Sequence, residues 1–514
     1  MHRASRSLRF TLCTAVAVLA ACPSVQVPEL RAPGAAPVLS AREPLKVHLR
    51  SGQLLVLQGW SDLPGDSALR GVGQRFDIRR RLVGQFSGVV PRDSIALLEV
   101  THSTTAHPAG SVILGVYTTI AGLVTVACLA DPKSCFGSCP TFYTGEQQDR
   151  PVAEGFSGSV ARSLEATDID DLADVHPAGR TFTLTMRNEA LETHAVRSLR
   201  LLVVPHPTTG QIVKDGEGRM FVASTATAPA DCQSTDGDCA SRVSARDGSE
   251  WMSRADSADL GRRDSIDLAF PAAGERPALL VTARQSFVST YVFYQSLAWA
   301  GSRVGELLAA VERSGPAAFP GLGSTLRSLG RVEILVRSAG GDWIEAGAFG
   351  EPGPIASDRQ AVPLAAAPTG DSLHVRLRFA RGAWRFDELA LVTLGEPVLP
   401  VALEPVRVER RGEADTAAQA RLRDPARYLV TYPGDRYEIV FELPQDGSRL
   451  ALFIESTGYY YEWMRPEWLR EESPAMLALM ATDHEAALKR MAPGYARLEP
   501  GLEAMFWSSR FGRR

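Results

Sequence analysis

An alternating pattern of apolar and polar side chains begins with Asp264-Ser265-Ile266-Asp267-Leu268-Ala269-Phe270-Pro271. It leads through a glycine-containing turn to the apolar run Ala278-Leu279-Leu280-Val281. Period-2 alternation bounded by turn residues is typical of β-strands. The pattern therefore predicts two strands joined by a polar turn.

The same order of patterns recurs nearer the C-terminus. Residues 435–441 alternate in the same way and lead through Gln445-Asp446-Gly447 to the apolar run 450–454. Both copies are followed by an aromatic stretch, at 291–294 and at 459–463. Two strands, a polar turn and an aromatic end, repeated, predict a repeated β-sandwich unit.

Further strands are predicted between the two copies, at 332–336, 343–345, 374–379 and 384–392. Their order is similar to a jelly-roll of the galactose-binding type, although no ligand motif maps onto it. From Pro474 to Arg490 the apolar residues recur with helical spacing instead, which predicts a helical tail.

The N-terminal part reads as short strands. Residues 45–49 alternate, Ser51-Gly52 forms a turn, and 54–57, 84–90 and 95–100 continue the pattern. This region resembles the small SH3-like or Sm-like β-barrels of bacterial lipoproteins. The basic run 79–81 lies between strands and is interpreted as a solvated loop rather than a polyanion site.

The first residues have the pattern of an export signal. Arg3, Arg6 and Arg9 precede an apolar run from Phe10 to Ala21 that is too short to span a bilayer. The run ends in Leu19-Ala20-Ala21-Cys22, which resembles a lipobox and predicts lipid attachment to Cys22. The alternative is a plain secretory signal with a chance cysteine. Pro23 resembles outer-membrane sorting signals, which favours the periplasmic or extracellular face of the bacterial outer membrane.

The remaining cysteines fit an oxidising compartment. Cys135 lies four residues from Cys139, and Cys232 lies seven from Cys239, so each pair is expected to form a local disulfide. A redox pair and a four-thiol zinc site are the alternatives, and Pro140 argues against the first. The leftover Cys128 is expected to be buried and inert.

Residues 110–130 carry no charge and are long enough to cross a bilayer as a helix. A single crossing would place both cysteine pairs in the reducing cytoplasm if Cys22 is lipidated outside. A segment that lies in the membrane near the anchor, or one that is buried in the fold, avoids this conflict. Both interpretations stay open beside the crossing.

Several motifs resemble a group of bacterial envelope lipoproteins to which no activity is assigned. They are Cys139-Pro140-Thr141-Phe142-Tyr143 after an apolar segment, Glu154-Gly155-Phe156-Ser157-Gly158, and the strand 201–204 that runs into Pro205-His206-Pro207. The resemblance covers most of residues 110–465. It implies an envelope protein and no particular chemistry.

Catalytic signatures are missing from the sequence. Gly155-Phe156-Ser157-Gly158-Ser159 nearly matches a nucleophile elbow but has Ser at its last position. The acidic cluster of Glu165, Asp168, Asp170, Asp171 and Asp174 is interpreted as a solvated helix start, with a Ca²⁺ loop or a carboxylate pair as the alternative. His194 and His206 could meet Glu189 or Glu192 at a metal, but lone histidines are usually structural. The aromatic run 459–463 is interpreted as the core and rim of a sandwich rather than a sugar platform.

The sequence therefore predicts a mainly β, multidomain lipoprotein with a non-catalytic binding or assembly role and an envelope protein or glycan partner. We assign no catalytic, cofactor-binding or metal-binding residue. A net charge of −4 gives no reason to expect nucleic-acid binding. The first alternative is an envelope-glycan hydrolase that uses paired carboxylates such as Glu154, Glu165 or Asp168, and the second is a structural membrane protein.

The expected regions are a signal peptide (1–21), a tether (22–39), a small barrel (40–105), an apolar helix (109–131), a β-rich domain with two disulfides (132–260), a sandwich (261–400), a repeat-like region (401–472) and a helical tail (473–514).

Overall fold

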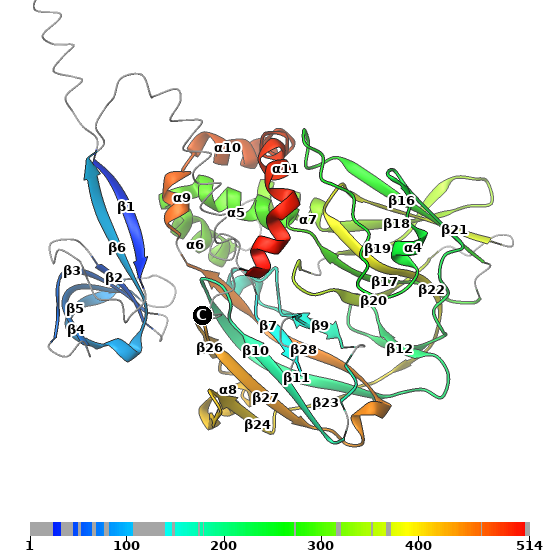
Figure 1. Ribbon diagram of the computed structural model, residues 1–514, viewed down its shortest axis with the longest axis horizontal. Helices are drawn as coiled ribbons and strands as arrows, with labels where there is room; N and C mark the ends of the chain where they lie inside the picture. The colour runs from blue at the N-terminus through cyan, green and yellow to red at the C-terminus, as the bar shows by residue number, and fades with distance from the viewer. Residues whose placement is uncertain are drawn as a thin grey trace, which may run out of the picture. The chain divides into compact units, whose positions relative to one another are not determined.

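The computed structural model describes residues 24–31, 45–49, 53–63, 68–76, 82–105, 139–145, 150–172, 175–177, 179–271, 274–314, 320–350, 353–365, 372–463 and 465–508. Within them the chain is mainly β, built from antiparallel sheets with a group of helices (Figure 1). It divides into two compact units, Met1–Val126 and Ala127–Arg514. The mainly β, multidomain fold predicted from the sequence is confirmed.

Some predicted features lie outside the described residues. They are the signal segment, Cys22, the run 79–81, the apolar segment 110–130, Cys128, Cys135 and Asp174. Among the helices in the described ranges, none combines the length and the apolar character needed to cross a membrane.

The N-terminal unit contains a six-stranded antiparallel sheet. Its strands, in sheet order, are β1 (Ser24–Arg31), β6 (Ile95–Thr105), β2 (Leu45–Leu49), β3 (Leu54–Asp62), β4 (Ala68–Phe76) and β5 (Leu82–Pro91), with the 3₁₀ turn η1 (Arg92–Ser94) before β6. Leu45, Val47, Leu55 and Leu57 alternate with less buried residues and belong to its small core.

Two expectations for this unit need correction. Residues 24–31 belong to a strand and not to a flexible tether, because β1 pairs with β6 from Ser24↔Thr105 to Arg31↔Leu98. The described strands also form an open sheet and not a closed barrel. The physical reason is that β6 has β2 on one edge and β1 on the other, so no edge of β6 is left for β5.

In the second unit, two sheets face each other in what we call the first sandwich. One sheet has the order β25 (Glu413–Ala414), β24 (Arg407–Arg410), β27 (Arg436–Glu442), β10 (Thr181–Arg187), β7 (Thr141–Thr144) and β8 (Ala153–Glu154). The other has the order β23 (Val401–Leu403), β11 (Glu192–Pro205), β28 (Leu450–Glu462) and β9 (Ala166–Asp171), with β26 (Leu429–Thr431) beside β11. Residues 132–260 and 401–472 therefore share these sheets instead of forming successive regions.

Two more sheets form the second sandwich. One has the order β12 (Gln211–Lys214), β13 (Met220–Ala223), β22 (Trp384–Val398), β17 (Pro277–Gln285) and β20 (Asp358–Pro363). The other has the order β15 (Gly237–Asp238), β14 (Asp231–Ser234), β16 (Arg263–Pro271), β21 (Ser372–Ala380), β18 (Arg331–Arg337) and β19 (Trp343–Gly350). Ile266, Leu268 and Phe270 of β16 point into the core between them, as the alternation predicts.

The two sandwiches are joined through β11. Leu201 and Val203 pack into the core of the first sandwich, whereas Leu202 and Val204 pack with Ile212 of β12 and Phe453 of β28. Successive side chains of a strand point to opposite faces, so an unbroken apolar run can serve two cores.

A group of helices lies at one end of the second unit (Figure 1). Three of them, α5 (Val288–Ala300), α6 (Val304–Ser314) and α7 (Pro320–Leu329), are inserted between β17 and β18, and α9 (Pro466–Arg470), α10 (Pro474–Thr482) and α11 (His484–Ser508) follow β28. The others are short: α4 (Ala240–Val243), α8 (Thr416–Arg423), η2 (Arg162–Leu164), η3 (Gly301–Arg303) and η5 (Gly447–Arg449). Helix α5 contacts α7, α9 and α10. The helical tail is confirmed.

The strands of the two predicted repeat copies correspond, but their aromatic ends do not. In both copies the first strand, β16 or β27, lies in one sheet and the next strand, β17 or β28, lies in another. The aromatic ends then differ, because Tyr291–Tyr294 lies in helix α5 whereas Tyr459–Trp463 lies largely at the end of β28. Helix α5 is buried on most sides, and a helix that is apolar all round gives no amphipathic signal to separate it from a strand.

Candidate functional site

A pocket lies between the first sandwich and the inserted helices, and we call it the Glu154 pocket. Its volume is about 380 Å³, within the lower part of the roughly 300–1,000 Å³ range of small-molecule sites. It is lined by Cys139, Glu154, Ser157, Gly158, Val160, Leu164, Gln285, Ser289, Thr290, Phe293, Tyr294, Val311, Leu322, Gly323, Leu326, Arg327, Gly353, Pro354, Ile355 and Tyr460. Most of the lining surface is apolar.

The Glu154 carboxylate has a defined place in the pocket wall. Glu154 ends the short strand β8, where it pairs with Thr141 of β7, and it is 3% exposed. Its Oε2 accepts a hydrogen bond of 3.2 Å from the backbone N–H of Ile355. A side chain at Gly353 would place Cβ only 1.8 Å from Glu154 Oε1, so this loop needs glycine to approach the carboxylate.

Cys139 and Tyr460 line the same pocket. The Tyr460 hydroxyl donates a hydrogen bond of 2.9 Å to the backbone oxygen of Ser157. Burial raises the pKa of the Cys139 thiol well above its usual range, and the carboxylates of Glu154, Glu192 and Glu462 raise it further. The thiol is therefore held neutral, and Cys139 is not an activated nucleophile.

Buried ionisable groups lie next to the pocket. Arg465 donates to Glu462 over 2.6 Å, and both side chains are 0% exposed. The Tyr294 hydroxyl also donates to Glu462, and its ring lies 4.8 Å from the Arg465 guanidinium carbon. Glu192, paired across the strands with Glu462, contacts His194 over 3.0 Å. The cluster is a buried polar network at the end of β11 and β28.

The cysteine predictions have different outcomes. Cys232 and Cys239 form the expected local disulfide. Cys139 is a free, buried thiol, so its expected bond to Cys135 is not formed. The reason is that Cys139 leads into β7 and packs among Phe142, Ala153 and Phe156 in the core of the first sandwich.

The three carboxylates of the hydrolase alternative lie in different environments. Glu165 is held by Arg197 at 2.7 and 2.6 Å and by the Tyr428 hydroxyl at 3.1 Å. Asp168 belongs to an acidic group whose member Asp170 is also repelled by Glu154, and among the three only Glu154 lines the Glu154 pocket. The described pockets thus bring no two of them together.

The acidic segment after Ala166 is not a solvated helix start. It is strand β9, with Asp170 and Asp171 buried. Asp168 and Asp170 lie near Asp358 of β20 and the buried Lys214 of β12, whose Nζ contacts Asp358 Oδ2 over 2.7 Å. Burial raises the pKa of Asp168 to about 6 and also raises that of Asp170, and repulsion from Asp358 adds to both shifts. We call Asp168, Asp170 and Asp358 the interface acids. Lys214 is the lysine beside them.

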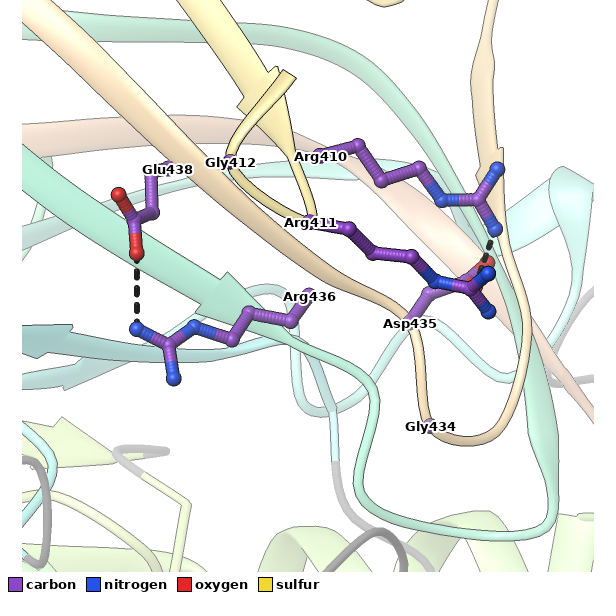
Figure 2. A pocket seen from close by; sticks show the side chains of 7 residues that line it. All are labelled: Arg410, Arg411, Gly412, Gly434, Asp435, Arg436 and Glu438. Carbon is purple, nitrogen blue, oxygen red and sulfur yellow. Dashed lines mark hydrogen bonds and ion pairs between the residues drawn. The ribbon is translucent and has the colours of Figure 1, made fainter.

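Two further hollows are lined by charged residues. Figure 2 shows a surface hollow of about 260 Å³ in which Arg410 contacts Asp435 and Arg436 contacts Glu438, over 2.5 and 2.8 Å. Arg411 and Gly412, both with positive φ, form the tight turn between β24 and β25. A larger hollow, of about 850 Å³, contains Arg284, which is paired with Glu250 and Glu503. In both, ion pairs account for most of the charge.

The other sequence candidates are structural. His194 meets Glu192, as one hypothesis allowed, but in the described residues no group of three or more His, Cys, Asp or Glu side chains could hold a metal ion. Phe156 has a positive φ, and the turn around Ser157 does not lead into the helix of a nucleophile elbow. Within the aromatic run, Tyr459 and Tyr460 are buried, which agrees with a core and rim role.

Sequence reasoning missed the helical side of the pocket. Phe293 of α5 and Leu322 and Leu326 of α7 come from a region interpreted as sandwich. The spacing of Leu322, Leu326 and Leu329 fits a helix period and was the available signal for α7. No comparable sequence pattern marked Ser289 or Gln285 as pocket residues.

The comparisons with known proteins assign the chain to no family. No family model and no curated protein matches the chain. Among solved structures, the chain is similar to the secreted serine protease VesC from Vibrio cholerae, with 9% identity, 70% of this chain and 74% of that chain covered, and a TM-score of 0.15. A likeness at this level carries no argument about fold or activity.

Proposed function

We propose that the protein is a lipid-anchored envelope protein that binds a small amphipathic molecule in the Glu154 pocket. The carrying observation is the pocket itself, whose wall is mainly apolar with Glu154, Cys139 and Tyr460 among its polar groups. Apolar concave sites with a few placed polar groups are the usual form of ligand sites. The anchor is the lipid expected on Cys22, and the location is the outer membrane.

A second observation supports a ligand. Ser289 lines the pocket, and its buried hydroxyl has no hydrogen-bond partner among the described residues. A buried polar group left unsatisfied costs about 1–3 kcal/mol. A polar group of a bound molecule would remove this cost.

The binding role is favoured over the hydrolase. A glycosidase needs two carboxyl groups about 5–10 Å apart across one substrate bond. Glu165 is bound by Arg197, and of the three carboxylates only Glu154 lines the pocket, where Cys139 is held as a neutral thiol. An envelope protein or glycan partner stays a prediction.

The test of pocket binding uses the full chain with Cys22→Ala, which removes the lipid and the need for detergent. The neutral fluorescent probe N-phenyl-1-naphthylamine is titrated into this chain and into one that also carries Val160→Trp and Leu326→Trp. These tryptophans fill the pocket from the sandwich side and the helix side. The control is Val401→Trp, at a position that is 54% exposed.

We expect saturable binding that the pocket-filling pair weakens at least tenfold (about 1.4 kcal/mol) and the control leaves unchanged. Circular dichroism and the unfolding temperature verify that each variant folds. No saturable binding to the parent chain, or equal binding to the folded pocket-filling pair, would refute the proposal. Fractionation of cells expressing the natural chain and Cys22→Ala tests the anchor separately, because only the natural chain should stay with the outer membrane.

A further inference from the structure

The charge around the Glu154 pocket is uneven. Three carboxylates, of Glu154, Glu192 and Glu462, act on the thiol of Cys139 in the pocket wall. Among the described residues that line the pocket, Arg327 is the one basic side chain, and it is exposed in the last turn of α7, at a boundary with a neighbouring outer hollow. The buried Glu154 carboxylate therefore lines the inner wall of the pocket, and the basic group lies at its rim.

The carboxylates have little freedom to move away from this side. Glu154 is fixed by the Ile355 N–H and by the close approach of Gly353. Glu462 is held by Arg465 and Tyr294, both buried. Fixed charges in a site of low dielectric act more strongly than the same charges in water.

The remaining walls suit the organic part of a cation. Phe293 and Tyr460 supply aromatic rings, and Leu322, Leu326 and Ile355 supply aliphatic surface. Aromatic faces attract ammonium groups by about 0.5–2 kcal/mol. Carboxylate and aromatic rings in one apolar pocket are thus complementary to an alkyl- or arylammonium ion and unfavourable for a carboxylate.

We propose that the Glu154 pocket takes an organic ammonium ion, with its nitrogen beside Glu154 and its apolar part along α5 and α7. This inference rests on the proposed ligand-binding function and deepens it, by naming the class of molecule bound. The observation that supports it is a buried carboxylate that lines an apolar and aromatic cavity. The basic residue of this cavity lies at the rim.

The experiment compares ligands of one chain length on the full chain with Cys22→Ala. Octylammonium, octyltrimethylammonium, octanol and octanoate are titrated at pH 7 by calorimetry. We expect at least one of the two cations to bind ten times or more tightly than octanol, and octanoate to bind most weakly. Octanol carries no charge and so reports the apolar pocket alone.

Two variants locate the effect. Glu154→Gln keeps the size of the side chain and the acceptor for the Ile355 N–H, and it should lower the affinity for the cation about tenfold, 1.4 kcal/mol, while octanol binding is unchanged. Glu438→Gln, a carboxylate of the surface hollow in Figure 2, should change neither affinity. If Glu154→Gln does not fold, the ligand series on the parent chain still decides the question.

The outcomes separate the two proposals. Equal affinity for octanol and both cations overturns the ammonium inference and leaves pocket binding intact. Tighter binding of octanoate also overturns it and points to Arg327. No binding of any of the four ligands, together with no binding of the naphthylamine probe, refutes the pocket function and the ammonium inference with it.

Discussion

Two groups of buried carboxylates in the second unit differ in the partners of their side chains. Beside the Glu154 pocket, Glu462 has Arg465 and Tyr294 as partners, and Glu192 has His194. Between the two sandwiches, Asp168, Asp170 and Asp358 are grouped around the single ammonium of Lys214. In the first group a buried guanidinium and a hydroxyl are hydrogen-bonded to Glu462, whereas in the second three carboxylates share one ammonium.

This difference separates two uses of buried charge. In the first group, hydrogen bonds fix the position of the Glu462 carboxyl, whose pKa burial raises to about 8, and a binding site needs such fixed positions. An unmatched acidic group relieves its repulsion by taking up protons, so its pKa values rise and its stability depends on pH. Three variants test this contrast.

The largest effect is expected for Arg465→Leu. The substitution leaves Glu462 buried without its guanidinium, which should lower the free energy of unfolding by about 3–5 kcal/mol at pH 8. Burial raises the pKa of Glu462 to about 8 even beside Arg465, so at pH 5.5 the carboxyl is neutral in both chains and the loss should be smaller there. Urea unfolding at both pH values measures it. Arg436→Leu, which breaks an exposed pair with Glu438, is the control and should cost less than about 1 kcal/mol.

The second largest effect is expected for Asp170→Asn, which changes one of the interface acids. Burial and the neighbouring carboxylates raise the pKa of Asp168 to about 6 in the folded state, against 3.8 ordinarily. The folded state thus binds more protons than the unfolded state between about pH 4 and 6, and stability falls as the pH rises through this range. Removing one of the repelling charges should raise the free energy of unfolding at pH 7.5 by about 1–3 kcal/mol.

The same variant should also flatten the dependence of stability on pH. Urea unfolding from pH 4.5 to 8 measures both effects. Glu396→Gln, at a carboxylate that is 91% exposed, is the control and should leave the curve unchanged. A destabilised Asp170→Asn chain would mean that the interface acids are matched after all, and the contrast with the pocket network would fail.

The smallest effect is expected for Tyr294→Phe, which removes one donor from Glu462. The expected loss is about 1–2 kcal/mol of unfolding free energy. Tyr428→Phe removes a similar donor from Glu165 near the surface, where water replaces it, and should cost less. Equal losses would show that burial does not distinguish the two carboxylates.

Local patterns predicted a good part of the fold. The alternation in 264–270 and 435–441 predicts β16 and β27 because one buried face imposes period 2, and the helical spacing after Pro474 predicts α10 and α11. The helices α5–α7 were missed, since α5 is buried on most sides. Strand β9 was missed because its carboxylates resemble a helix start and only their burial between the sandwiches shows otherwise.

The sequence by itself determined the β class, the helical tail and the short disulfide between Cys232 and Cys239, all of which depend on residues close in the chain. Only the tertiary structure decided the Glu154 pocket, because Glu154, Phe293 and Tyr460 lie far apart in sequence and meet through sheet pairing and helix packing. It also decided that Cys139 stays a free thiol, since packing in the core, not spacing, sets its surroundings. Long-range contacts of this kind leave no local period in the sequence.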